Sequence, residues 1–287
     1  MLSRTFSRSI LLGLVPLFLA CGGGGDGAEG DSEGGPDGGG AQQAPVDLSN
    51  AGSITGNVTF TGSAPAPEPI DMSAEEECAA AHEAQPVRHS VIVGDGGGLA
   101  NVFVYVKEGL PAGEWPTPNT AVTLDQQGCQ YQPHVLGLQT GQNLEIKNSD
   151  GILHNINTTP TANRGFNISQ PTTMTSTRTF AQPEVMIPVR CDVHGWMEAY
   201  IGVTDHPYFA VSANDGSFTI DRLPPGQYVL EAWHEVYGVQ TANVTVEANT
   251  PATVSFTFDG STAGTAPLGE PLVIHHAPGH EGAGGAR

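Results

Sequence analysis

The feature that most constrains the fold of this chain is a series of short runs in which apolar and polar residues alternate. The runs are 53–60, 90–93, 102–106, 239–246 and 254–258. This period of two is typical of strands that bury one face. One short stretch rich in Ala and Glu, 72–83, predicts a helix, and no stretch sustains a helical period over a longer distance. The chain is therefore predicted to be all-β.

The clearest chemical signal is a loop of seven residues that contains Cys191, His194 and Met197. Successive members of this set are separated by two residues, so a loop that folds back can point all three side chains at one centre. His154 ends an upstream strand-like run and offers a second imidazole. Two His, one Cys and a weak axial Met are the ligand set of blue-copper sites. We therefore predict that His154, Cys191, His194 and Met197 bind copper.

The order of these residues resembles a small cupredoxin of the plastocyanin–amicyanin group. The matching parts lie between residues 119 and 205, namely 131–133, 141–148, 150–155, 177–180, 191–197 and 198–203. The resemblance implies a Greek-key β-sandwich and an electron carrier that moves single electrons between copper and a partner protein. It also implies that Asn155 ties the His loop to the Cys loop. From its place in the loop, His194 is expected to be the ligand nearest solvent, with Gly195 and Trp196 in a docking patch.

Each candidate ligand also has a plainer interpretation. A single Cys is often a buried apolar side chain or half of a disulfide, and His154 or Met197 alone could be structural. Structural zinc is the rival metal, although its sites use Cys, His and carboxylates rather than Met. Copper storage or delivery and a non-redox surface β-sandwich are alternative functions. The sequence contains no His-Glu-x-x-His or Gly-x-x-x-x-Gly-Lys-Ser/Thr motif, and its one Gly-x-Ser-x-Gly match, 30–34, lies in a Gly-rich stretch with no strand pattern before it, so we expect no enzyme.

The N-terminal segment predicts export and a membrane anchor, and the last residues predict a tail with little to bury. Residues 1–20 combine Arg4 and Arg8 with an apolar run of signal-peptide length. The run ends just before Cys21 and looks like a bacterial lipoprotein site, with Cys21 lipidated and the protein in the periplasm or cell envelope; an ordinary secretory signal is the alternative. Residues 21–51 form a Gly-rich acidic linker, and residues 261–287 a Gly- and Pro-rich tail, both with little to bury.

A second resemblance involves segments on both sides of the copper loop. The Asp215-Gly216-x-Phe218 turn and the 223–228 segment resemble a carboxypeptidase regulatory-like domain, a transthyretin-like β-sandwich, and so do the runs 54–58 and 101–106. The Asp-Gly pair also predicts a hairpin. We predict that residues 52–112 plus 208–260 form this sandwich and that the cupredoxin domain, 113–207, is inserted into it. Two or three consecutive domains are the alternative.

Cysteine counting bears on the copper ligand. If Cys21 carries lipid, then Cys78, Cys129 and Cys191 remain, an odd number in an oxidising compartment. A disulfide between Cys78 and Cys129 would leave Cys191 free for copper. We predict this pairing; a disulfide between Cys129 and Cys191, which would consume the ligand, is the alternative. His134 and the remaining histidines are read as structural or exposed.

The formal net charge of −20 limits the class of partner. Nucleic acid is excluded, because its phosphates would repel so acidic a chain. A redox partner with a basic surface, such as a basic cytochrome, would be attracted. Solubility explains the same charge equally well.

Overall fold

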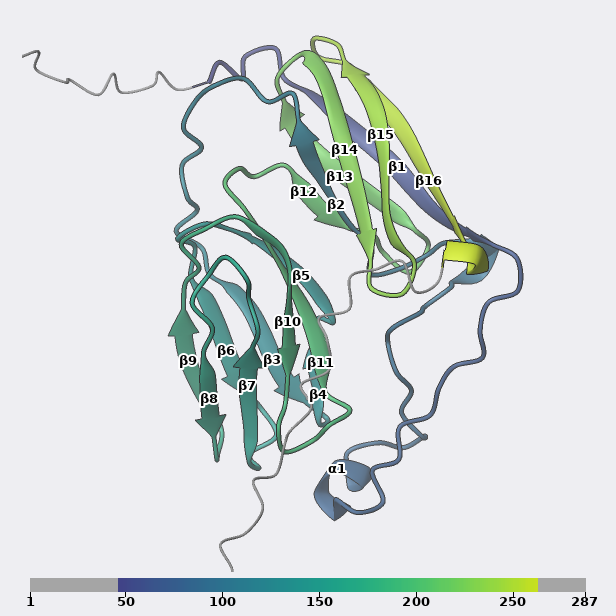
Figure 1. Ribbon diagram of the computed structural model, residues 1–287, viewed down its shortest axis with the longest axis vertical. Helices are drawn as coiled ribbons and strands as arrows, with labels where there is room; N and C mark the ends of the chain where they lie inside the picture. The colour runs from purple at the N-terminus through teal and green to yellow at the C-terminus, as the bar shows by residue number, and fades with distance from the viewer. Residues whose placement is uncertain (1–45, 263–287) are drawn as a thin grey trace, which may run out of the picture. The chain divides into compact units, whose positions relative to one another are not determined.

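The computed structural model describes residues 46–262, in which sixteen strands and only one short α-helix are found, and this confirms the all-β prediction (Figure 1). The predicted signal peptide, Cys21, most of the linker and nearly all of the 261–287 tail lie outside the described residues. Within 46–262, no helix is long and apolar enough to cross a membrane. The strands form two β-sandwiches, each with its own core.

The first sandwich combines a three-stranded sheet, in the order β13-β1-β16, with a four-stranded sheet, in the order β12-β2-β14-β15. Its strands are β1 (Gly52–Thr61), β2 (Phe103–Glu108), β12 (Phe209–Val211), β13 (Ser217–Leu223), β14 (Gly226–His234), β15 (Gly238–Val246) and β16 (Pro251–Asp259). Alternate residues of these strands, such as Ile54, Val104 and Leu230, are fully buried between the sheets. The predicted alternation thus places one face of each strand in the core.

One strand of this sandwich joins two distant parts of the chain. Strand β1 pairs antiparallel with β13, where Ile54 lies opposite Ile220, and parallel with β16, where Ile54 lies opposite Ala252. Both partners follow the second sandwich in sequence. The first sandwich is therefore built from segments on either side of the second, which is the inserted arrangement. The exact limits of the two domains stay predictions.

The second sandwich lies between β2 and β12 in sequence. It combines a five-stranded sheet, β5-β11-β10-β7-β8, with a four-stranded sheet, β4-β3-β6-β9. Its strands are β3 (Val122–Gln127), β4 (Gln130–Gln132), β5 (Val135–Gln139), β6 (Leu144–Asn148), β7 (His154–Thr158), β8 (Asn167–Gln170), β9 (Met174–Arg178), β10 (Glu184–Arg190) and β11 (Glu198–Thr204). Leu124, Ile146 and Ile201 are fully buried in its core.

Three local predictions need correction. Residues 90–93 form an isolated bridge, Val93 to Leu99, rather than a strand, and the helix α1 is limited to Glu76–Ala80. The Asp215-Gly216 turn forms, but it connects β12 and β13, which belong to different sheets, so it makes no hairpin. The reason is that β1 takes β13 as its own partner. A Cβ on Gly216 would lie 2.1 Å from the Val58 carbonyl oxygen, so glycine is required there.

Buried side chains also connect the two sandwiches. Phe103 of β2 packs in one cluster with Tyr200 of β11 and Trp233 of β14. Next to them, His134 Nε2 pairs with the carboxylate of Glu235, and both side chains are buried. The two cores are thus linked by an aromatic cluster and a buried hydrogen bond.

Candidate metal centre

The candidate site lies where two neighbouring strands begin and end. His154 is the first residue of β7, and the Cys191–Met197 loop directly follows β10. Strands β7 and β10 pair antiparallel, with Arg190 opposite Asn157, so the start of β7 lies beside the end of β10. The loop closes on itself, because the Cys191 amide donates to the Met197 carbonyl and the Met197 amide to the His194 carbonyl.

Three of the four predicted ligands meet at one point. The Nδ1 atoms of His154 and His194 lie 2.9 Å apart, and Cys191 Sγ lies 3.9 Å from His194 Nδ1. The ligand atoms of these three residues all lie within 4.8 Å of one another. Met197 is 1% exposed and belongs to the same buried cluster as Cys191. A thiol and two imidazoles with facing donor atoms are a donor set that suits copper.

Asn155 forms the bridge between the two loops. Its Oδ1 accepts hydrogen bonds from the Asp192 amide at 2.6 Å and from Cys191 Sγ at 3.3 Å. Its Nδ2 donates to the Asp192 carboxylate, which also accepts from Asn157 and Asn167. These bonds fix the position of the sulfur relative to β7. The role of Asn155 in copper binding stays a prediction.

The sequence analysis missed Asp150, which orients His154. Its carboxylate accepts from His154 Nε2 at 2.9 Å and from the amides of Gly128 and Cys129 at 2.6 and 2.8 Å. In its neutral form, a His154 that donates from Nε2 keeps a lone pair on Nδ1, the atom that faces His194. Such carboxylate–histidine pairs commonly orient metal ligands. The spacing of four residues between Asp150 and His154 was the available sequence signal.

The charges at this site favour a thiolate. Burial opposes the charged form of His154, but hydrogen bonds to Asp150 and Cys191 outweigh it and raise the pKa of His154 to about 9. Burial likewise opposes the Cys191 thiolate, yet hydrogen bonds from His154 and from backbone groups lower the pKa of Cys191. Burial and then the charge of His154 lower the pKa of His194. A metal binds the thiolate and the neutral imidazole, so the lowered pKa values of Cys191 and His194 favour metal binding, whereas His154, with its raised pKa, would have to release a proton.

The surroundings of the outer ring nitrogen of His194, Nε2, differ from the expectation of a ligand near solvent. Cys78 and Cys129 form a disulfide and Cys191 is free, so the pairing that would consume Cys191 does not occur. Cys78 Sγ lies 3.7 Å from His194 Nε2, and His194 is only 2% exposed. Trp196 donates from Nε1 to the Cys129 carbonyl instead of facing solvent freely. His194 is thus as buried as the other three predicted ligands, and its exposure does not set it apart as the ligand nearest solvent.

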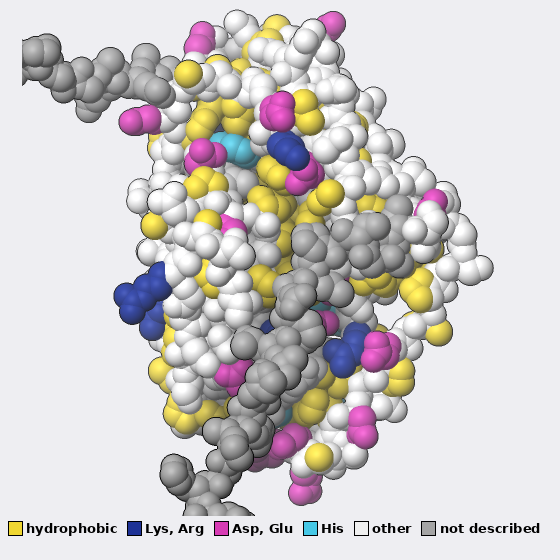
Figure 2. All heavy atoms as spheres, viewed as in Figure 1, with side chains coloured by type: hydrophobic (Ala, Val, Ile, Leu, Met, Phe, Trp, Pro, Cys, Tyr) yellow, Lys and Arg dark blue, Asp and Glu magenta, His cyan; other side chains and the backbone are white. Residues whose placement is uncertain are grey.

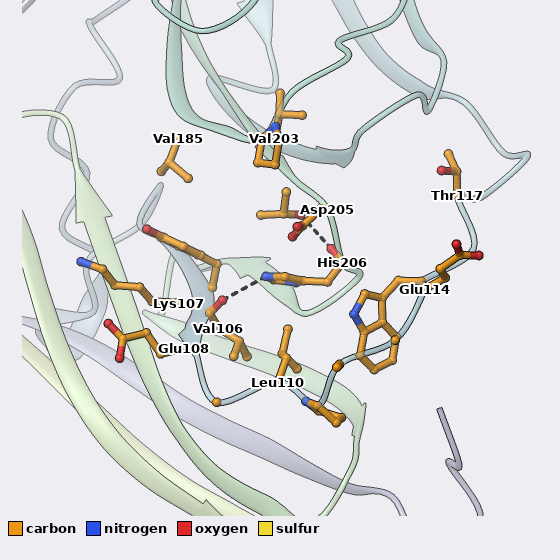
Figure 3. A pocket seen from close by; sticks show the side chains of 18 of the residues that line it. Val106, Lys107, Glu108, Leu110, Glu114, Thr117, Val185, Val203, Asp205 and His206 are labelled. Atoms are coloured by element: carbon orange, nitrogen blue, oxygen red, sulfur yellow. Dashed lines mark hydrogen bonds between the residues drawn. The ribbon is translucent and has the colours of Figure 1, made fainter. Parts of the chain in front are cut away.

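The protein also has a cavity that does not include the candidate metal ligands. It is an open cavity of about 1090 Å³ lined by 105–117, 183–185 and 203–206. Figure 3 shows that the His206 ring is hydrogen-bonded to the Val106 carbonyl in the wall of this cavity. Glu108, Glu114 and Asp205 are among the other lining side chains. It contains none of the predicted ligands.

The comparisons with known proteins concern parts of the chain. Residues 198–259 match the model of the carboxypeptidase regulatory-like domain. No curated protein matches. Parts of solved copper proteins are similar in structure, and the first is a copper-containing nitrite reductase from Thermus scotoductus SA-01. It is 20% identical with a TM-score of 0.28, over 33% of this chain and 25% of that one. This chain thus matches only a quarter of the reductase.

Two smaller proteins give similar results. An oxidised amicyanin variant is 16% identical with a TM-score of 0.27, over 35% of this chain and 97% of that one. A purple cupredoxin from Nitrosopumilus maritimus is 18% identical with a TM-score of 0.25, over 29% and 98%. Scores this low carry no argument about copper, which depends on the side chains described above. The chain therefore carries a carboxypeptidase regulatory-like match over residues 198–259, in a strand framework that also contains a second β-sandwich.

Proposed function

We propose that this protein binds one copper ion through His154, Cys191, His194 and Met197 and carries single electrons. The convergence of one buried thiol and two imidazole Nδ1 atoms is the observation that supports this proposal most strongly. Bound copper would supply a one-electron couple between its cupric and cuprous states. Zinc is less well matched, because the fourth side chain in the loop is a thioether.

The protein's own residues would do three things for such an ion. The paired strands β7 and β10 would hold both loops at a fixed separation, so that the donors move little between oxidation states. Asp150 and Asn155 would keep His154 and Cys191 in their binding orientations. Burial of the donors would exclude water, and this favours an electron carrier over a copper enzyme, which needs an open position for substrate.

The test is a titration of the metal-free protein with Cu(II), followed by absorption spectroscopy and voltammetry. We expect one equivalent to bind, with an intense thiolate-to-copper band and a reversible wave. Cys191→Ser should abolish the band, whereas His89→Gln, a histidine outside the site, should leave it unchanged. A protein that stays colourless would refute the proposal. Exchangeable Cu(I) without a reversible wave would instead support storage or delivery.

We further propose that the protein acts outside the cytoplasm as a lipoprotein anchored through Cys21 and that it meets a basic redox partner. The Cys78–Cys129 disulfide fits an oxidising compartment. On the face drawn in Figure 2, Asp and Glu side chains are spread over the surface rather than gathered in one patch. This distribution supports attraction through net charge. Fatty-acid labelling that is lost in Cys21→Ser, together with electron-transfer rates that fall as salt rises, would test both statements.

A further inference from the structure

The disulfide that covers His194 joins the second sandwich to a segment that connects two strands of the first sandwich. The chain leaves β1 at Thr61, forms α1, and returns to the first sandwich at β2. Cys78, in α1, is bonded to Cys129, in the turn between β3 and β4 of the second sandwich. We call residues 62–101 the cap. The disulfide between the cap and the second sandwich therefore places two sulfur atoms beside a predicted copper ligand, His194, which already faces a third sulfur, that of Cys191.

The two nitrogens of His194 face two different sets of donors. Its Nδ1 faces His154 and Cys191, whereas its Nε2 lies 3.7 Å from Cys78 Sγ. The ligand atoms of Cys78, Cys129 and His194 all lie within 4.8 Å of one another, and all three residues are buried. In the disulfide, the two sulfurs are bonded to each other and cannot act as thiolate ligands. Reduction of the disulfide would place two thiols beside the Nε2 atom of His194.

We propose that the reduced form of this protein binds a second copper ion, as Cu(I), through Cys78, Cys129 and His194 Nε2. An external dithiol would supply two electrons and two protons to the sulfur–sulfur bond and would itself become a disulfide. Cu(I) would then replace the two thiol protons. Thiolates are soft ligands that select Cu(I). The inference rests on the proposed function only in taking copper as the metal, because the second site uses donors of its own apart from the shared His194 ring.

A reductant can reach the buried sulfurs only when the cap opens. Its helix is only five residues long. Apart from the disulfide and the Cys78–His194 contact, its hydrogen bonds to the Cys129 turn run from His82 to the Gly128 carbonyl and from Gln130 to the Val87 carbonyl, the second at 3.4 Å. Opening also requires Ile70 and Met72, which are buried in the core cluster of the second sandwich, to leave that cluster. Opening of the cap would expose Cys78 and Cys129 without unfolding the second sandwich.

The experiment compares Cu(I) stoichiometry in the two redox forms. Every sample carries Cys21→Ser, so that the anchor cysteine adds no thiol. The metal-free protein is kept oxidised or reduced with a phosphine, desalted without oxygen, and titrated with Cu(I) against a chromophoric chelator. Thiol counting verifies the reduction, and circular dichroism reports the fold. We expect one equivalent in the disulfide form and two in the reduced form.

Two variants separate this inference from the proposed function. Cys191→Ser removes a donor of the first site only, so it should bind no tight Cu(I) when oxidised and one equivalent when reduced. The double variant Cys78→Ser, Cys129→Ser should bind one equivalent under both conditions. If the disulfide form binds none, the proposed function fails. If reduction adds no equivalent, or if the reduced form has lost its native dichroism, the second site is refuted.

Discussion

Asp150 provides the sharpest test of how this fold would prepare a metal ligand. The isosteric change Asp150→Asn keeps the size of the side chain but removes its charge. In the wild-type protein, the Asp150 carboxylate accepts hydrogen bonds from His154 Nε2 and from the amides of Gly128 and Cys129. An amide has one acceptor oxygen and one donor nitrogen, so it cannot accept from all three groups. His154 would then lose its fixed ring orientation.

The size of the effect follows from this loss. Removal of such an outer partner typically weakens metal binding 10- to 100-fold, which corresponds to about 1.4–2.7 kcal/mol. The assay is a chelator competition titration with Cu(II), compared with Asp125→Asn as the control. Asp125 accepts from Ser149 and lies near Lys147, without contact to His154. Equal affinities for wild type and Asp150→Asn would show that His154 is positioned by other means.

Three other outcomes test the fold. Replacing Cys78 and Cys129 by alanine opens a loop of 51 residues, so chemical unfolding should show a loss of about 4 kcal/mol. Gly202→Ala puts a Cβ 2.5 Å from the Phe103 ring, and overpacking should cost about 1–3 kcal/mol, an effect that Phe103→Ala should largely relieve in the double variant. Burial above all lowers the pKa of His234 from 6.5 to about 3, so the unfolded state binds the proton more readily. The stabilising effect of neutral His234 is thus complete above pH 6.5 and falls by about 1.4 kcal/mol per pH unit towards pH 3. When the free energy of unfolding is measured in urea between pH 7 and 4, it should fall less steeply with falling pH in His234→Gln than in the wild type. Equal slopes of the unfolding free energy against pH would contradict this reasoning.

If the protein carries electrons as proposed, the position of His194 limits the surface that a partner protein could contact. Its outer nitrogen faces a disulfide rather than solvent, and Trp196 is bonded to the Cys129 carbonyl. A partner protein would therefore contact the cap or the exposed Val193 and Gly195 rather than the imidazole edge. Neighbouring motifs could not predict this, because Cys78, which covers His194, precedes Cys191 by 113 residues.

The sequence by itself determined the features that depend on local spacing. Alternating residues gave the strands their buried faces, and the short Cys191–Met197 spacing brought Cys191 and His194 into one loop. Only the tertiary structure decided which distant segments meet at that loop. It paired β1 with β13, bonded Cys78 to Cys129, and brought the amides beside Cys129 to Asp150. The physical reason is that strand pairing and packing join residues far apart in the chain, and no short pattern encodes such contacts.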